Sequence, residues 1–208
     1  MTVTRPLRAD AARNRESLLV AAAAEFAERG ADASISDIAR RAGVGKGTVF
    51  RHFPTKDHLL VAIVLDRMAT LSAAGEALLG GDPEAGLVEF LTVSAEYKQQ
   101  LDLSFLLAAS PTVVADPEVA RARDRMFQAT YALVERAQEH GVVRADVTGA
   151  DVILLMCAPN YVAGPLLDAD PELWRRYLAM LFDGLRPAGA HPLPHPAPAS
   201  PLPPAPTT

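Results

Sequence analysis

The stretch at residues 42–56, AGVGKGTVFRHFPTK, combines three glycines and two phenylalanines with four side chains that carry, or can carry, a positive charge. Lysine, arginine, histidine and threonine are side chains that grip phosphate oxygens and read base edges in nucleic acids. Glycines at the start of a helix let its backbone amide groups approach a phosphate closely. The stretch therefore fits nucleic-acid binding, although a helical hairpin with an ordinary solvated charged face fits the same composition.

Two short helices joined by a turn would position these side chains. Helical spacing and a capping serine, Ser34 or Ser36, predict a helix at residues 35–41. A second helix is predicted at residues 45–52, and the turn between them contains Gly43, which suits the left-handed conformation. This pattern describes a helix-turn-helix. Its apolar residues are expected to pack with those of a preceding helix at residues 10–29: Leu19, Phe26, Ile38, Ala39, Val44, Val49 and Phe53.

Helical periodicity continues along the rest of the chain, and no stretch alternates with period two for long enough to predict a sheet. Further helices are predicted at residues 56–79, 84–101, 104–110, 118–139, 150–167 and 171–185. Pro111 is expected to stop the helix before it, and Pro159 to bend or break the helix around it. The final 22 residues contain nine prolines and no charged side chain. Residues 187–208 are therefore predicted to form a disordered tail.

Charge is distributed unevenly along the chain, whose formal net charge is −5. Residues 1–60 hold ten Lys and Arg against seven Asp and Glu, whereas residues 61–208 hold ten against eighteen. Such a split favours one basic face on an acidic body, although sixty residues can show it by chance. A single cysteine excludes a disulfide framework, and the longest apolar runs, residues 59–65 and 152–158, are far below the roughly 18–20 residues of a membrane span. With no secretory signal pattern at residues 1–16, the sequence predicts a soluble cytoplasmic protein without a membrane partner.

The segment SISDIARRAGVGKGTVFRHFPTKDHLL, preceded by LLVAAAAEFAERGAD, resembles the DNA-binding domain of the TetR family of transcriptional regulators. The resemblance runs through about residues 13–60, with the first helix, the IA..AGV.KGT core and the HF..K..L exit in register. The segment VRADVTGADVILLM is similar to the SbtR-like branch of that family.

The resemblance implies an all-α protein. A three-helix helix-turn-helix DNA-binding domain would occupy residues 13–58 after an arm at residues 1–12, and a ligand-binding and dimerisation domain of about six helices would occupy residues 59–186. The implied function is a repressor that binds double-stranded DNA at a palindromic operator as a homodimer and is released by a small-molecule effector. The dimer is expected to form through the helices at about 150–167 and 171–186. One apolar stripe of the last helix would pack against the partner copy and the preceding helix in a four-helix bundle: Leu173, Tyr177, Met180, Leu181 and Leu185.

Roles at the DNA follow from the same resemblance. Four residues correspond to phosphate contacts: Ser36, Thr48, His52 and Lys56. Three residues correspond to the recognition-helix face that enters the major groove: Lys46, Gly47 and Arg51. Phe50 stands where the family most often has a tyrosine whose hydroxyl bonds a phosphate, and a phenylalanine retains only packing against a sugar. Gly45 replaces the usual capping serine, which weakens that cap.

A mostly apolar pocket between helices of the second domain would hold the effector. Its candidate lining residues are Phe90, Tyr97, Leu101, Phe105, Met126, Phe127, Tyr131 and Tyr161. Asn160 is a further candidate, because an uncharged polar side chain beside Pro159 interrupts an apolar helix and is expected to face a ligand or the partner subunit. All of these residues also fit ordinary core packing.

A helical enzyme and a protein-interaction module without DNA binding are the alternative interpretations. The side chains that an enzyme would use, His140, Asp146, Asp151 and Cys157, form neither a nucleophile–base pattern nor metal-ligand spacing. No catalytic residue, cofactor or metal site is therefore expected. A pure interaction module leaves the phosphate-binding side chain types of the first sixty residues unexplained.

Overall fold

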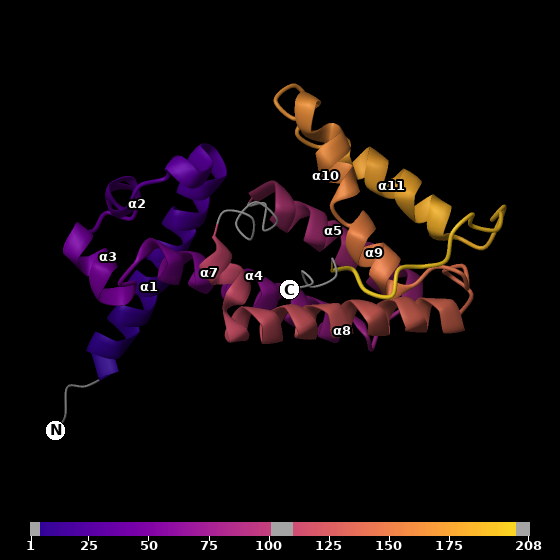
Figure 1. Ribbon diagram of the computed structural model, residues 1–208, viewed down its shortest axis with the longest axis horizontal. Coiled ribbons are helices and arrows are strands. Elements are labelled where there is room, and N and C mark those ends of the chain that lie inside the picture. The colour runs from indigo at the N-terminus through magenta and orange to yellow at the C-terminus, as the bar shows by residue number, and fades with distance from the viewer. Residues whose placement is uncertain (1–4, 101–109, 203–208) are drawn as a thin grey trace, which may run out of the picture. The chain divides into compact units, whose positions relative to one another are not determined.

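The computed structural model describes the backbone of residues 5–100 and 110–202, and the side chains of residues 14–97 (apart from residue 31) and 110–202. All regular structure in these ranges is helical, and they contain no strand (Figure 1). The all-α prediction is confirmed. The chain divides into two compact units, the first made of residues 1–67 and 100–121 and the second of residues 68–99 and 122–208.

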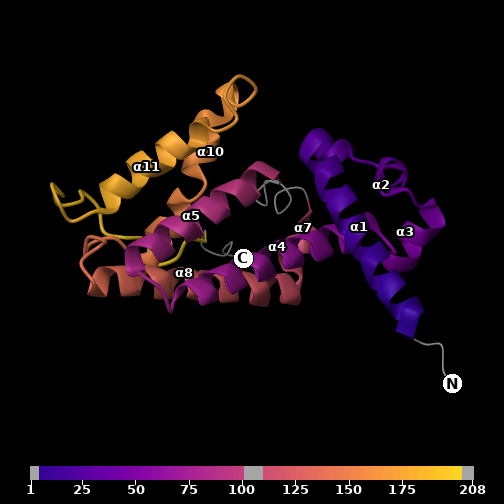
Figure 2. The same cartoon turned by 180° about the vertical axis from the view of Figure 1, so that it is seen from behind.

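The first unit contains the predicted pair of short helices. Its elements are α1 (Arg5–Arg29), the 3₁₀ turn η1 (Gly30–Asp32), α2 (Ile35–Arg41), α3 (Lys46–His52), the first half of α4 (Lys56–Leu78) and α7 (Pro111–Ala115). Helices α1, α2 and α3 pack in sequence, as both views show (Figures 1 and 2). The predicted helix-turn-helix is therefore present, and its preceding helix begins five residues earlier than expected.

The core of the first unit consists of the residues that the helical spacing selected. Ile38 and Val49 are fully buried, and Phe26 and Phe53 are 2% and 3% exposed. Val44 is only half-buried, because it lies in the turn between the helices. Because one side of each short helix is buried in this core, the opposite side must face outwards.

The second unit is built around a buried apolar cluster. Its elements are the second half of α4, α5 (Pro83–Gln100), most of α8 (Pro117–Glu139), α9 (Gly149–Leu155), α10 (Ala158–Ala163), the 3₁₀ turn η2 (Gly164–Leu166) and α11 (Leu173–Leu185). Phe90 and Trp174 are the largest fully buried side chains in this cluster. Helices α10 and α11 lie side by side in both views (Figures 1 and 2).

Prolines divide the helices differently from the prediction at two places. The predicted helix at 150–167 is broken into α9, α10 and η2, and Pro159 stands in the first turn of α10. Proline suits that position because the first turn of a helix leaves its amide groups unpaired. Pro111 likewise begins α7, with the Ser110 hydroxyl accepting from the Val113 amide at 3.4 Å. Pro111 was expected only to stop a preceding helix, whose residues 104–109 lie outside the described residues.

The apolar stripe predicted for α11 faces mainly into its own unit. The residues of α11 that are buried are Trp174, Leu178, Phe182 and Leu185. Leu173, Tyr177 and Leu181 are partly buried against the same cluster, whereas Met180 is 59% exposed. The stripe therefore packs in part against its own unit, where α11 contacts the preceding helix α10, and its packing against a partner copy stays a prediction.

Two helical stretches reach the length and mean hydropathy of a membrane span, Lys56–Leu78 and Gly149–Leu166, although their uninterrupted apolar runs are short. Core helices of soluble proteins meet the same criterion, so these stretches are weak support for a membrane span. Half of the α4 window is buried inside the fold, as in a core helix. Only 28% of the second window is buried, which leaves an apolar surface on α9 and α10.

Residues 187–202 follow α11 without forming a helix or strand. One point of this segment contacts the turn after α8, where the Arg144 guanidinium donates to the His191 carbonyl. Arg144 also forms two bonds to Asp146, at 2.6 and 2.8 Å. These bonds lower the pKa of Asp146, which also accepts from the Leu193 amide. The extended backbone of the segment thus makes hydrogen bonds on both sides of Pro192.

Candidate nucleic-acid interface

The turn between α2 and α3 is held by backbone hydrogen bonds. The Val44 amide donates to the Ala39 carbonyl at 3.0 Å, and the Gly43 amide donates to the Arg40 carbonyl at 3.2 Å. These two bonds form a Schellman ending, which requires a left-handed residue. Gly43 supplies it, with φ of +68°. The direction in which the chain leaves α2 towards α3 is therefore set by the backbone.

The start of α2 is capped by Ser34 and not by Ser36. The Ser34 hydroxyl accepts from the Asp37 amide at 3.2 Å and donates to the Asp37 carboxylate at 2.6 Å. This hydroxyl bond, with the neighbouring Arg40 and Arg29 guanidinium groups, lowers the pKa of Asp37. Ser36 is half-buried in the first turn of α2. Because the cap is made by another residue, the Ser36 hydroxyl is left for an external partner.

Ion pairs join α2 to α1. The buried carboxylate of Glu25 lies 3.3 Å from Arg29 and 3.4 Å from Arg41, and Arg41 also pairs with Glu28 at 2.5 Å. Arg29 in turn lies 3.2 Å from Asp37. The arginines at the end of α1 and on α2 are thus largely matched by carboxylates within the fold.

The start of α3 is bare. Gly45 is its N-cap and offers no side-chain bond, as the substitution of the family's serine predicted. A Cβ placed on Gly47 would meet no atom within 4 Å, so the surface above the first turn of α3 is open. A phosphate or base edge can therefore approach the backbone here without a steric obstacle.

One face of α3 carries exposed side chains whose spacing brings them together. Lys46, Gly47, Phe50 and Arg51 are exposed, at positions that share one side of a helix. Val49 is fully buried on the other side. Within the part of the chain that the structure describes, neither Lys46 nor Arg51 has a carboxylate partner. This face therefore presents two cations that the fold does not neutralise.

The chain leaves α3 through a corner that positions the remaining predicted contacts. The Thr55 hydroxyl caps α4 by accepting from the His58 amide at 3.2 Å. The Lys56 ammonium lies 5.3 Å from the centre of the Phe26 ring, so it stands beside the first unit's core. His52 is half-buried, and its ring centre lies 6.3 Å from that of Phe53. The predicted DNA-contacting residues thus gather on the start of α2, on α3 and on the start of α4.

The effector-pocket candidates are not gathered in one described cavity. Phe90 is fully buried, and Tyr97, Met126, Phe127 and Tyr131 are half-buried. Leu101 and Phe105 lie outside the described residues. Tyr161 is 83% exposed, which is not the position of a pocket wall. The expectation that Tyr161 lines an effector pocket is therefore not met in this structure.

Two of these candidates make tight contacts with neighbouring glycines. A Cβ on Gly149 would lie 2.0 Å from Cδ1 of Tyr131, and one on Gly75 would lie 3.3 Å from the Phe90 ring. Contacts this close leave no room for a ligand between the residues. They favour the ordinary core role that the sequence left open for Tyr131 and Phe90.

Asn160 is buried inside the second unit. Its amide nitrogen donates to the Ala95 carbonyl at 2.8 Å, and its Oδ1 atom has no hydrogen-bond partner. The indole nitrogen of Trp174 is also buried without a partner. Tryptophan was not among the sequence candidates, and its apolar surroundings gave no signal for it.

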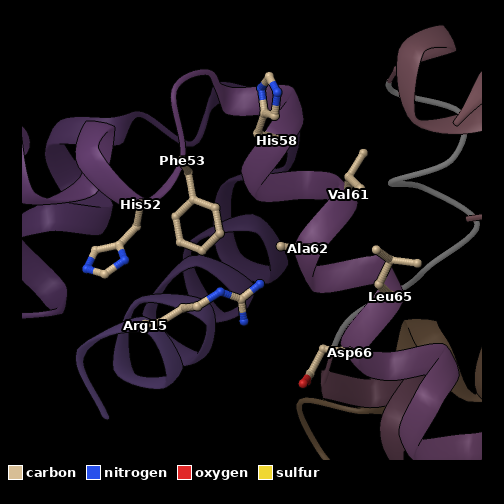
Figure 3. Close-up of a pocket in the computed structure, with 8 residues that line it drawn as sticks. All are labelled: Arg15, His52, Phe53, His58, Val61, Ala62, Leu65 and Asp66. Atoms are coloured by element: carbon tan, nitrogen blue, oxygen red, sulfur yellow. The ribbon is translucent and has the colours of Figure 1, made fainter. Parts of the chain in front are cut away.

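A cleft in the first unit was also missed (Figure 3). It has a volume of about 430 Å³ and lies between α1, the end of α3 and α4. Figure 3 shows Arg15 below the Phe53 ring, with His58 and Val61 on α4. Arg15 is far from the other lining residues in the sequence, so no local pattern signals this site.

Two family models match successive parts of the chain. Residues 18–63 match the model of bacterial regulatory proteins of the tetR family. Residues 82–187, more than half of the chain, match the C-terminal domain of SbtR-like transcriptional regulators. The chain belongs to the TetR family of transcriptional regulators. Both the family resemblance and the SbtR-like branch seen in the sequence are confirmed.

Relatives of this TetR-family chain are regulators and not enzymes. The HTH-type transcriptional repressor LfrR of Mycolicibacterium smegmatis is 33% identical over 128 residues, covering 60% of this chain and 65% of that protein. The repressor Rv3405c of Mycobacterium tuberculosis is 56% identical over 55 residues, covering 26% and 29%. The chain thus spans less than two thirds of these curated relatives. The crystal structure of the TetR regulatory protein from Mycobacterium vanbaalenii has a TM-score of 0.65 and 35% identity, covering 87% of this chain and 99% of that one.

Proposed function

We propose that this chain is a transcriptional repressor that binds double-stranded DNA through α3. The observation that carries the proposal is the exposed face of α3, on which Lys46 and Arg51 have no carboxylate partner among the described residues. Arginine and lysine on such a helix reach guanine edges in the major groove. Ser36, Thr48, His52 and Lys56 are the proposed phosphate contacts on either side, and they set the register of the helix. The curated relatives, both named as repressors, support the sign of regulation.

The proposed DNA-binding form is a homodimer. Large apolar side chains are exposed on α9, α10, η2 and α11: Leu154, Leu155, Tyr161, Val162, Leu166 and Met180. A second copy of the chain, related by two-fold symmetry, would cover this surface. Its presence would also explain why so little of residues 149–166 is buried within one chain. A two-fold dimer requires a palindromic operator, with half-sites about one helical turn apart, roughly 34–36 Å.

Dimer formation has its own test. Changing Leu155 and Val162 together to glutamate should place charges in the covered surface and yield a monomer at micromolar concentration, measured by light scattering. The matched control is Leu193→Glu, an exposed apolar residue after α11, which should leave the dimer intact. A native mass near 22 kDa would show that the chain is a monomer.

We further propose that a small molecule bound in the second unit releases the DNA. Two buried polar atoms support this site, the Asn160 Oδ1 and the Trp174 indole N–H, which have no partner. Leaving a buried polar atom unpaired costs about 1–3 kcal/mol, so a ligand that reached either atom would gain by pairing it. The division between the two units falls within α4, after Arg67. Because α4 is continuous and belongs to both units, effector binding and DNA binding can each favour a different position of this helix.

Selection of bound duplexes from random DNA, followed by sequencing, tests the DNA-binding function. The expected result is an inverted repeat. Binding to it should weaken steeply with salt, and Lys56→Ala should flatten the slope by about 0.9 if one phosphate contact is lost. Lys46→Ala should weaken binding as well. Recovery of no enriched sequence, together with salt-independent binding, would contradict the proposal.

A further inference from the structure

The cleft in the first unit is large enough for a small organic ligand. Its volume of about 430 Å³ lies within the range of known ligand pockets, about 300–1,000 Å³. Its apolar walls come from Phe53, at the end of α3, and from Val61 and Leu65 on α4. All of its lining residues belong to one unit of the chain, so the cleft exists independently of the effector site proposed in the second unit.

Arg15 gives the cleft a positive group that is available to a ligand. Its guanidinium lies 5.4 Å from the centre of the Phe53 ring, stacked on the apolar wall. Arg29 and Arg41 in the same unit are paired with carboxylates, whereas Arg15 has no such partner among the described residues. A guanidinium held on a ring keeps its N–H fork free and can bind a planar carboxylate through two parallel hydrogen bonds.

The other polar residues of the cleft indicate where the charged end of a ligand would lie. The His58 Nδ1 atom is 2.7 Å from the Thr55 hydroxyl, so only its Nε2 atom is left for a ligand. Asp66 lines the α4 side of the cleft. Figure 3 shows the Arg15 guanidinium beside the Phe53 ring, with His52 on its other side. The negative end of a ligand is therefore favoured at Arg15 and its apolar end between Phe53 and α4.

We propose that this cleft binds a small aromatic carboxylate, with the carboxylate on Arg15 and the ring against Phe53, Val61 and Leu65. The occupant would touch His52 and Phe53, where α3 ends. The cleft is thus a second ligand site, inside the unit that carries the helix-turn-helix.

Titration of the full-length chain with benzoate and with benzamide tests the site, using backbone amide chemical shifts in NMR. The two probes have the same shape and differ in charge. Benzoate is expected to shift the amides of Phe53, Val61 and Leu65, and benzamide to bind at least tenfold more weakly, because it lacks the charge-assisted bonds to Arg15. Equal binding of the two probes, no binding of benzoate, or shifts confined to the second unit would overturn the proposal.

Variants assign the binding to Arg15. Arg15→Gln should weaken benzoate binding about tenfold, whereas Arg176→Gln, which changes another exposed arginine, on α11, should leave it unchanged. Circular dichroism establishes that each variant is folded. Val61→Trp keeps Arg15 but fills the cleft, and should also abolish the shifts; it decides the question if Arg15→Gln does not fold. If folded Arg15→Gln or folded Val61→Trp bound benzoate as well as the native chain does, the cleft would not be the site.

Discussion

Helices α2 and α3 have the same length, seven residues, and each carries two permanently charged basic side chains. On α2, both Arg40 and Arg41 are paired with carboxylates of α1 and α2. On α3, Lys46 and Arg51 are exposed and have no such partner within the described ranges. The number of basic residues on a helix therefore does not locate a DNA-binding surface. What locates it is the charge that the fold leaves unneutralised.

Arg51→Ala should have the largest effect on DNA binding, and it tests directly whether the unpaired charges of α3 make the interface. Loss of an arginine that reads a base should weaken operator binding tenfold to a hundredfold and relax sequence preference at particular positions. Fluorescence anisotropy with labelled operator measures both. Arg40→Ala is the matched control, since it removes the same charge from α2 and should change affinity less than twofold. Equal losses for the two variants would mean that pairing within the fold does not decide the interface.

Glu25→Gln should show that the α2 ion pairs are structural. The Glu25 side chain is 4% exposed and joins Arg29 to Arg41, so removing its charge should lower the free energy of unfolding by about 1–2 kcal/mol. Urea denaturation measures this change. Glu28→Gln, on the same helix but 56% exposed, should change stability by less than about 0.5 kcal/mol. If Glu25→Gln left the free energy of unfolding unchanged, the ion pairs between α1 and α2 would not be structural.

Phe50→Tyr tests whether residue 50 on α3 contacts the DNA. The ring is 48% exposed on the proposed DNA face, and a tyrosine hydroxyl restores the phosphate bond that the family resemblance implies. One such bond is worth about 0.5–1.5 kcal/mol, so operator affinity should rise by roughly twofold to tenfold. Phe50→Leu, without a hydroxyl, should give no gain. Anisotropy titrations in which Tyr and Leu behave alike would place residue 50 away from the DNA.

Acid titration should reveal a smaller contribution from the start of α2. The Ser34 hydroxyl, followed by Arg40 and Arg29, holds the pKa of Asp37 below its ordinary value of 3.8. Below that value the unfolded chain binds the proton more readily than the folded chain does, so the stabilisation is complete above pH 3.8 and is lost as the pH falls through the lowered pKa. The melting temperature of Asp37→Asn should therefore lie below that of the native chain at neutral pH, and the two should converge in acid. A constant difference at all pH values would exclude Asp37 ionisation as the cause.

Deletion of residues 187–208 should have the smallest effect. This segment has no helix or strand in its described part, and its proline-rich, uncharged composition offers neither a core nor phosphate neutralisation. The segment's hydrogen bonds to Arg144 and Asp146 are exposed, so their loss should move the melting temperature by only about 1–2 °C, with operator affinity unchanged. Differential scanning calorimetry provides the measurement. A much larger fall would show that the segment stabilises the second unit.

Local sequence patterns were sufficient to predict most helix boundaries of the first unit. Gly43 and a capping serine bounded α2 and α3 to within one residue, because caps and left-handed turns depend on a few adjacent residues. The second unit followed its local patterns less closely. The helix expected at 150–167 became three short pieces, since Pro159 and Pro165 each begin a new turn. The stripe on α11 shows a further limit, because an apolar helix face fits equally well against its own core or against a partner.

The all-helical fold, the position of the helix-turn-helix and the chain's membership of the TetR family could be read from the amino-acid sequence, because helix periodicity, turn chemistry and a continuous motif are all properties of neighbouring residues. Which charges remain available depends on tertiary contacts. Glu25 precedes Arg41 by sixteen residues, and Arg15 precedes Phe53 by thirty-eight, yet each pair is in contact. Whether a basic side chain is neutralised, stacked on a ring or left for DNA depends on which helices pack together. That packing is set by the apolar residues between them and cannot be read from the charged residues themselves.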